Sequence, residues 1–472
     1  MRKPEQRSTA RRVDNASPTI AVRPDAAYRG YNQPVPKFEL PEEGIPARAA
    51  YEIIRHEEMF DCNPDLNLSS FCTTEMVPEA RQLIMDSLHV NFIDHDQYPQ
   101  TEVIHHRCVD ILANLFHAPK GGNHYGTATI GSSEAVMLAG LAHKWTWKNR
   151  RKAQGKPYDR PNVIYGGDVQ IVWKKFARYF DVEERMAPLE KGTYVLTAKQ
   201  VEKLIDENTT CVCAILGTTF TGEQDEIRKI NDLLVRVKRE KGWDIPLHVD
   251  GASGGMISIF TRPEYAWDFR LEQVRSINVS GHKTGLVYPG VGWVLFKDRS
   301  DFPEDLVFYV NYLGSEMPTA TLNFSRGSSH IIAQYFMFLH LGRKGYATLA
   351  KMQMENAGYL AQRLVKSGKW DILGHPVIPV VGVTLKPRIK RYNVFDVSFK
   401  LRERGWVVSA YTLPPDCQDI AMLRVVVRVH MNTDMCDILA VDIENACNYL
   451  EEHGGTAKPP QLHSHAQSQK HC

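Results

Sequence analysis

Between residues 126 and 300, short apolar runs alternate with stretches of helical spacing. The strand-like runs lie at 162–165, 210–216, 245–249, 276–279 and 292–296, and stretches such as 199–207 and 226–241 separate several of them. Apolar runs joined by helices predict a largely parallel sheet that is covered on both faces. Ligands of such sheets bind at the carboxyl ends of the strands, so residues that follow these runs are the first candidates for a functional site.

One such strand end carries a lysine. The run 276–279 is followed by Ser280-Gly281-His282-Lys283, and Gly285 follows two positions after the lysine. An ammonium group at the end of a buried strand is costly unless its charge is used, paired or removed. A Schiff base with a carbonyl group, as in pyridoxal 5′-phosphate (PLP) enzymes, removes the charge. Taken alone, the motif favours an ordinary loop lysine, and the rest of the chain is needed to change that interpretation.

Two further features could complete such a site. Gly131-Ser132-Ser133-Glu134 opens a predicted helix at 135–153, and the backbone N–H groups and dipole at a helix N-terminus favour a phosphate. The same pattern also forms simple helix caps. Asp250 ends the run 245–249, where its carboxylate suits the pyridine nitrogen of PLP, although a cap or turn role is also open. The order of phosphate site, aspartate and lysine favours a PLP site, with Lys283 placed 33 positions after Asp250.

Composition excludes other classes of protein. The net charge is +2, which gives no field for nucleic acid or a membrane surface, and no apolar run is long enough to span a bilayer. The nine cysteines are scattered, which indicates reduced thiols in a cytoplasmic enzyme. Cys211 and Cys213 lie in an apolar run, which favours buried thiols over a metal or redox pair. No metal site is expected.

The chain divides into four predicted parts. Residues 1–60 are an N-terminal segment, partly disordered, and 61–350 form the large ligand-binding domain. Residues 351–453 mix strand-like runs and helices in a smaller α+β domain, and 454–472 are a flexible tail rich in histidine.

Several motifs along residues 40–455 point to one known family. They are Leu68-Ser-Ser-Phe71, Asn91-Phe-Ile-Asp94, Ile130-Gly-Ser-Ser-Glu-Ala135, His248-Val-Asp-Gly-Ala-Ser-Gly-Gly255, Ser280-Gly-His-Lys283 and Asn323-Phe-Ser-Arg326. With these motifs the sequence resembles the PLP-dependent amino-acid decarboxylases of fold type I, specifically glutamate decarboxylases of the bacterial and plant type. The resemblance implies an α/β fold with a mostly parallel seven-stranded sheet and a smaller C-terminal α+β domain.

The resemblance also implies residue roles. Lys283 would bind PLP, Asp250 would pair with the ring nitrogen, and Gln170 would lie against one ring face. The phosphate and ring region would be contacted by Ser132, Ser133, Thr219, Ala252, Ser280 and His282, and by Ser325 of a partner subunit. The substrate side-chain carboxylate would be bound by Ser70, Phe71, Asn91 and Asp94, and the α-carboxylate region by Arg424. The family usually has threonine where this chain has Ser70.

The implied reaction is the α-decarboxylation of L-glutamate to 4-aminobutanoate in a homodimer at least, with a hexamer as a further possibility. Two alternatives remain open: a PLP-dependent decarboxylase or lyase of another amino acid, and a non-catalytic PLP-fold binding protein. His471 matches a penultimate histidine of bacterial relatives whose tail closes over the active site at higher pH. The alternative is a solvated tail. The tail lacks a tryptophan and a basic amphipathic helix, so calmodulin binding is not expected.

Overall fold

The computed structural model describes residues 38–311 and 317–458. The chain separates into two units, residues 1–63 and 64–472. In the first unit, α2 (Ala47–Glu58) is the helix of the described residues. The predicted domain boundaries inside the second unit stay a prediction.

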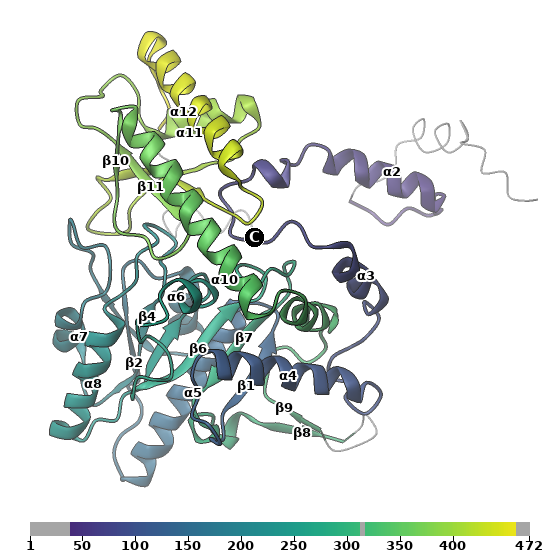
Figure 1. Ribbon diagram of the computed structural model, residues 1–472. Coiled ribbons are helices and arrows are strands. Elements are labelled where there is room, and N and C mark those ends of the chain that lie inside the picture. Colours follow the sequence, from purple (N-terminus) through teal and green to yellow (C-terminus); the bar gives the residue numbers. More distant parts are fainter. Residues whose placement is uncertain (1–37, 312–316, 459–472) are drawn as a thin grey trace, which may run out of the picture. The chain divides into compact units, whose positions relative to one another are not determined.

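The second unit is built on a seven-stranded sheet of order β1-β7-β6-β5-β4-β2-β3 (Figure 1). Its strands are β1 (Tyr125–Thr129), β2 (Asn162–Gly166), β3 (Glu183–Ala187), β4 (Thr209–Ile215), β5 (Leu247–Asp250), β6 (Val274–Ser280) and β7 (Gly292–Phe296). The five strands from β6 to β3 are parallel, whereas β7 and β1 add antiparallel pairs at one edge. The prediction of a mostly parallel α/β sheet is therefore confirmed.

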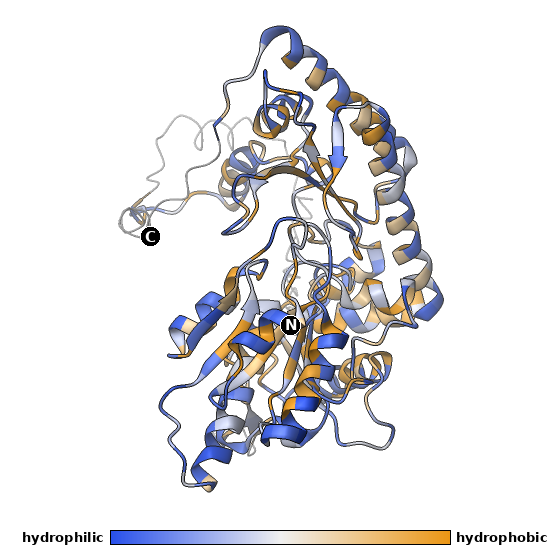
Figure 2. Cartoon of the chain, turned by 90° about the vertical axis from the view of Figure 1, so that its left-hand side faces the viewer, coloured by the Kyte–Doolittle hydropathy of each residue, from blue (hydrophilic) through white to orange (hydrophobic). Residues whose placement is uncertain are grey.

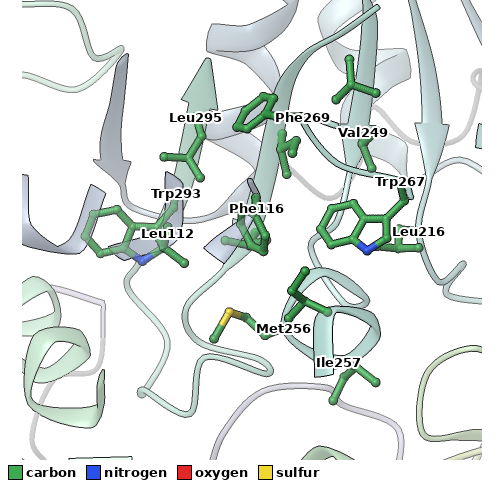
Figure 3. Packing of buried hydrophobic residues seen from close by; sticks show 14 of the residues in the cluster. Leu112, Phe116, Leu216, Val249, Met256, Ile257, Trp267, Phe269, Trp293 and Leu295 are labelled. Atoms are coloured by element: carbon green, nitrogen blue, oxygen red, sulfur yellow. The ribbon is translucent and has the colours of Figure 1, made fainter. Parts of the chain in front are cut away.

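One face of this sheet carries the main hydrophobic core. On this face, Val249 and Leu216 pack with Phe116, Met256 and Trp267 in a dry aliphatic and aromatic core (Figure 3). Figure 2 shows the sheet strands as largely hydrophobic, with hydrophilic residues on the outward sides of the helices. Burying one such large side chain contributes about 1.5–3 kcal/mol.

Helices cover both faces. They are α3 (Pro78–Asp86), α4 (Pro99–Leu115), α5 (Ser132–Ala153), α6 (Ile171–Tyr179), α7 (Ala198–Leu204), α8 (Ile227–Lys241) and α9 (Gly255–Thr261). The other sheet face packs against α5 and α6, where Cys211 and Cys213 are buried beside Trp173 and Phe176. The prediction that these two cysteines are core thiols is confirmed.

The long helix α10 (Ser329–Lys366) contacts α4 and α9 with its first half and α12 (Thr433–His453) with its second. Gly342 interrupts it with φ 56° and ψ −175°, a left-handed φ that favours glycine. A second sheet of order β10-β11-β13-β12 is antiparallel throughout. Its strands are β10 (Trp370–Ile372), β11 (Val380–Leu385), β12 (Ser409–Thr412) and β13 (Ala421–Val426). Helix α11 (Val394–Leu401) lies between β11 and β12 in the sequence.

A short hairpin of β8 (Phe308–Val310) and β9 (Met317–Thr319) completes the strands. Helix α3 ends at Asp86, where the Ser87 hydroxyl donates to the carbonyl of Leu83 at 2.6 Å. None of the helices in the described ranges combines the length and the apolarity needed to cross a membrane.

Candidate active site

A cavity of about 210 Å³ lies at the carboxyl ends of the parallel strands, beside the start of α5. Residues from four strand ends and from the starts of α5 and α6 converge there because parallel strands present their carboxyl ends at one edge of the sheet. The wall contains nine of the residues that the sequence singled out for a cofactor: Ser132, Ser133, Gln170, Thr219, Asp250, Ala252, Ser280, His282 and Lys283. Residues separated by 151 positions, Ser132 and Lys283, thus share one cavity.

Lys283 lies partly buried in the wall of this cavity. Its Nζ donates a hydrogen bond to the hydroxyl of Ser253 at 3.2 Å and lies 5.4 Å from the centre of the Phe71 ring. Burial lowers the pKa of Lys283 from its usual value, and the negative charge of Asp250 opposes that shift. A lysine in this environment releases its proton more readily than a surface lysine, which favours nucleophilic chemistry.

Asp250 presents one carboxylate oxygen to the protein and the other to the cavity. Its Oδ1 accepts hydrogen bonds from the backbone N–H of Ala252 at 3.1 Å and from Nδ2 of Asn278 at 3.0 Å. Among the described residues, no hydrogen bond to Oδ2 is made, so this oxygen is left for a ligand. The group can therefore accept a hydrogen bond from a protonated pyridine nitrogen.

The start of α5 is arranged for an anion. In the described residues no side chain caps this helix at Gly131, and the hydroxyls of Ser132 and Ser280 lie 2.5 Å apart at the cavity wall. A Cβ on Gly292 would lie 2.5 Å from the carbonyl carbon of Gly131, so glycine lets β7 pass against the helix start. Uncapped N–H groups with nearby hydroxyls favour a phosphate.

His282 lies beside this helix start. Its Nδ1 donates to the carbonyl of Val291 at 2.9 Å, which leaves Nε2 as the other ring nitrogen of the neutral side chain. Burial lowers the pKa of His282 below its usual value, and the charge of Lys283 acts in the same direction. A bound phosphate would favour the protonated ring, whose Nε2–H could then donate to it.

These groups fit PLP on structural grounds. The cavity combines a partly buried lysine, a carboxylate with one oxygen unused by the protein, and an uncapped helix start. These three features match the aldehyde, the ring nitrogen and the phosphate of that cofactor.

The residues predicted to bind substrate fall into two groups. Phe71 and Arg424 lie near Lys283: the Arg424 guanidinium is 5.1 Å from the Phe71 ring centre, and its Nη1 donates to the carbonyl of Thr219 at 2.8 Å. Phe71 and Lys283 also line a second, more apolar cavity of about 470 Å³. The Ser70 hydroxyl accepts a hydrogen bond from the backbone N–H of Cys72 at 3.1 Å.

Asn91, Asp94 and Ser325 are not in the wall of the Lys283 cavity within one chain. Asn91 instead accepts a hydrogen bond from the backbone N–H of Arg326 at 3.1 Å and forms a β-bridge with Gly327. The segments that carry Asn91 and Ser325 therefore lie side by side. His471, the predicted gate, lies outside the described residues.

Sequence reasoning missed one carboxylate in the cavity wall. Asp168 is 1% exposed, and neither of its side-chain oxygens has a hydrogen-bond partner in the described structure. Burial raises the pKa of Asp168 to about 7. The available signal was the one used for Asp250, a carboxylate just after a strand-like run, but Gly166 and Gly167 made the segment resemble a plain turn.

Glu102, His105 and His106 of α4 form a separate cluster whose potential metal ligands lie within 4.8 Å of one another. However, Nε2 of His105 accepts a hydrogen bond from the backbone N–H of Ala128 at 3.0 Å. The neutral ring then carries its proton on Nδ1, the atom directed at Glu102, and cannot offer that atom to a metal. The geometry favours a carboxylate held by imidazoles.

Comparison with known proteins shows the family to which the chain belongs. The model of the pyridoxal-dependent decarboxylase conserved domain matches residues 41–386, so the chain belongs to the pyridoxal-dependent decarboxylase family. It is 49% identical over 439 residues to a glutamate decarboxylase of Solanum lycopersicum, covering 92% of this chain and 86% of that protein. A glutamate decarboxylase of Aliivibrio fischeri is 42% identical over 422 residues, covering 89% and 91%.

A solved structure of a Lactobacillus brevis glutamate decarboxylase superposes with a TM-score of 0.87 at 38% identity, covering 91% of this chain and 98% of that one. The family and fold expected from the sequence motifs are confirmed.

Proposed function

We propose that the protein is a PLP-dependent glutamate decarboxylase, which converts L-glutamate to 4-aminobutanoate and CO₂ and consumes one proton per turnover. The observation that carries the proposal is the single cavity that unites Lys283, Asp250 and the start of α5. The choice of glutamate is supported by similarity over most of the chain to proteins named glutamate decarboxylase.

PLP, when bound, supplies an electron sink for the electron pair left on Cα as CO₂ departs. The chain's own residues hold and orient the reacting groups. Lys283 offers the amine that holds the cofactor, and burial favours its unprotonated form. Oδ2 of Asp250 accepts from the ring nitrogen, and Ser132, Ser133 and His282 bind the phosphate.

The remaining cofactor roles follow from position in the wall. Gln170 lies at the N-terminus of α6, where its Oε1 accepts from the backbone N–H of Val172 at 2.6 Å, so its amide is held in place against the ring region. Thr219, Ala252 and Ser280 line the same cavity from three other strand ends, where they would contact the ring and phosphate regions of the bound cofactor.

Substrate recognition is proposed to use two chains. Arg424 binds the α-carboxylate region. Phe71 lies beside both Lys283 and Arg424, and the preceding residue, Ser70, is assigned to the substrate side-chain carboxylate with it. Asn91 and Asp94 bind the substrate side-chain carboxylate in the site of the neighbouring subunit, and Ser325 contacts that subunit's phosphate. This assignment explains why these three residues do not line the Lys283 cavity of their own chain. It requires a homodimer at least. Sedimentation of the holoenzyme tests it: a fully active monomer would contradict the assignment.

We further propose that the enzyme is cytoplasmic, because all eight cysteines of the described residues are free thiols.

The decisive experiment measures CO₂ release from a panel of amino acids by the PLP-loaded protein. Release from L-glutamate far above all others supports the proposal. Faster CO₂ release from another amino acid would identify that amino acid as the substrate in place of glutamate. If PLP binds but no amino acid of the panel releases CO₂, a non-catalytic binding protein would be favoured. Borohydride should fix the cofactor covalently to Lys283, and Lys283→Ala should lose both the visible absorbance and the activity.

A further inference from the structure

A continuous polar stripe runs beneath α5 on one face of the sheet. Strands β5 and β6 pair so that His248 lies opposite Ser276 and Asp250 opposite Asn278. Side chains alternate along a strand, so these four share a face, while Val249 and Ile277 point to the apolar core on the other. His248, Ser276 and Asn278 are 0% exposed and Asp250 6%. Polar groups this deeply buried are costly unless they are hydrogen-bonded.

The stripe is a chain of short hydrogen bonds that starts on α5. Nε2 of His143 lies 2.7 Å from the Ser276 hydroxyl, which lies 2.7 Å from Nδ1 of His248. Nε2 of His248 lies 2.7 Å from Oδ1 of Asn278, whose Nδ2 lies 3.0 Å from Oδ1 of Asp250. Four links therefore connect α5 to the carboxylate in the cavity wall.

The chemistry of the groups assigns every proton in this chain. Ionised Asp250 can only accept, so the amide N–H of Asn278 donates to it and the amide oxygen faces His248. His248 must then donate from Nε2 and accept at Nδ1 from the Ser276 hydroxyl. That hydroxyl oxygen in turn accepts from Nε2–H of His143. Every hydrogen bond thus donates toward Asp250, and both imidazoles are neutral.

The surroundings of the two histidines agree with neutral rings. Burial lowers the pKa of His248 to about 4, although the charge of Asp250 opposes the shift. Burial also lowers the pKa of His143 well below its usual value, and the charges of His248 and Arg275 act in the same direction. The rings pack against aromatic side chains, Trp173 for His248 and Phe296 for His143.

We propose that His143, Ser276, His248 and Asn278 are positioning residues that orient Asp250 and stabilise its negative charge toward the cofactor ring nitrogen. This inference rests on the proposed function, because it takes Asp250 as the partner of that nitrogen. With Oδ1 occupied by Asn278 and Ala252, Oδ2 is the oxygen directed to the ring. The chain acts by orientation and polarisation and not by proton conduction, since the amide of Asn278 does not relay a proton.

The central test removes one link. Ser276→Ala leaves Nδ1 of His248 without a donor, which permits the other tautomer and turns Nε2 into an acceptor facing the Asn278 oxygen. We expect kcat to fall about 10-fold with KM within about twofold of wild type. We also expect the pH midpoint of the visible absorbance of bound PLP to shift, and PLP to dissociate more readily in equilibrium dialysis.

Ser258→Ala is the matched control. Ser258 is also 0% exposed, and its hydroxyl has no hydrogen-bond partner in the described structure. This variant should match wild type in kcat, absorbance midpoint and PLP affinity. At His143, the first group of the hydrogen-bond chain, His143→Phe removes the donor to Ser276 and His143→Gln retains an N–H donor. The Phe variant should shift the midpoint in the same direction as Ser276→Ala by a smaller amount, and the Gln variant should restore it.

The outcomes separate this inference from the proposed function. A wild-type protein that does not bind PLP overturns both. A wild-type protein that decarboxylates glutamate, while Ser276→Ala and His143→Phe behave like Ser258→Ala, overturns the positioning chain alone. If Ser276→Ala does not fold, the test is the pH midpoint of the PLP absorbance in His143→Phe and His143→Gln. A midpoint that is the same in both variants and in wild type would overturn the positioning role.

Discussion

Replacing Asp168 with asparagine should stabilise the protein at neutral and alkaline pH. The side chain lies in the cavity wall after β2, with both oxygens buried and without hydrogen-bond partners in the described structure. Its neighbour Asp225 is equally buried but accepts hydrogen bonds from the backbone N–H groups of Leu196 at 2.7 Å and Ile215 at 2.6 Å. Burial raises the pKa of both carboxyls, and the charge of Asp168 adds to the shift at Asp225. Because two backbone donors stabilise ionised Asp225 and none in the described structure is bonded to Asp168, we assign the shared proton to Asp168.

The magnitude follows from the pKa of Asp168, which burial raises to about 7. A carboxyl with a raised pKa in the folded state has no effect on stability well below its unfolded pKa, where both states are protonated. As pH rises, the unfolded chain ionises first, so stability is lost between about pH 4 and pH 7 and stays lower above that. Three pKa units correspond to at most about 4 kcal/mol. Asparagine has the same shape and no ionisation, so it removes this penalty.

The assay is thermal unfolding of the holoenzyme from pH 4.5 to 8. We expect Asp168→Asn to raise the melting temperature by about 3 °C or more at pH 8 relative to wild type, and by little at pH 4.5. Asp159→Asn, at an exposed position, is the control and should follow wild type throughout. Asp225→Asn should destabilise by about 1–3 kcal/mol, because the new amide presents N–H to one of two backbone donors. Equal pH profiles for Asp168→Asn and wild type would refute the assignment of the proton to Asp168.

Three further predictions concern the reaction. Lys283→Ala should abolish turnover and the visible absorbance band of the cofactor. Retention of either would contradict the assignment of Lys283 as the lysine that binds PLP. Asp250→Asn should lower kcat by about 10²-fold or more, since the ring nitrogen loses a charged partner; a kcat within a few-fold of wild type would contradict that role. Deleting residues 456–472, which include His471, should extend glutamate decarboxylation to higher pH, because the neutral imidazole is proposed to close the site; an unchanged pH midpoint in a rate profile from pH 4 to 8 would exclude this gate.

The site residues that sequence reasoning located share one physical property. Asp250 and Lys283 each end an apolar run, and parallel strands present their carboxyl ends at one edge of a sheet. The helix start at Ser132 is recognisable from glycine and serine before a helical run. These local signals place three groups at one edge of the sheet without any knowledge of packing.

Other elements carry no such local signal. Strand β3 has the sequence Glu-Glu-Arg-Met-Ala and lies at a sheet edge, where a partly exposed strand needs no apolar run. Likewise β1 is held by its antiparallel pairing with β7, in which Tyr125 pairs with Phe296, 171 positions further along the chain. Strand direction at this edge depends on tertiary pairing.

The sequence by itself determined the class of fold, the family and the order of lysine, aspartate and phosphate site, because these depend on periodicity and on residues adjacent in the chain. Only the tertiary structure decided that His143 reaches Asp250 through Ser276, His248 and Asn278. That connection depends on the register of β5 against β6 and on α5 packing over both. It also decided that Asn91 and Ser325 lie together outside the cavity, since segments more than 200 positions apart meet there through backbone hydrogen bonds.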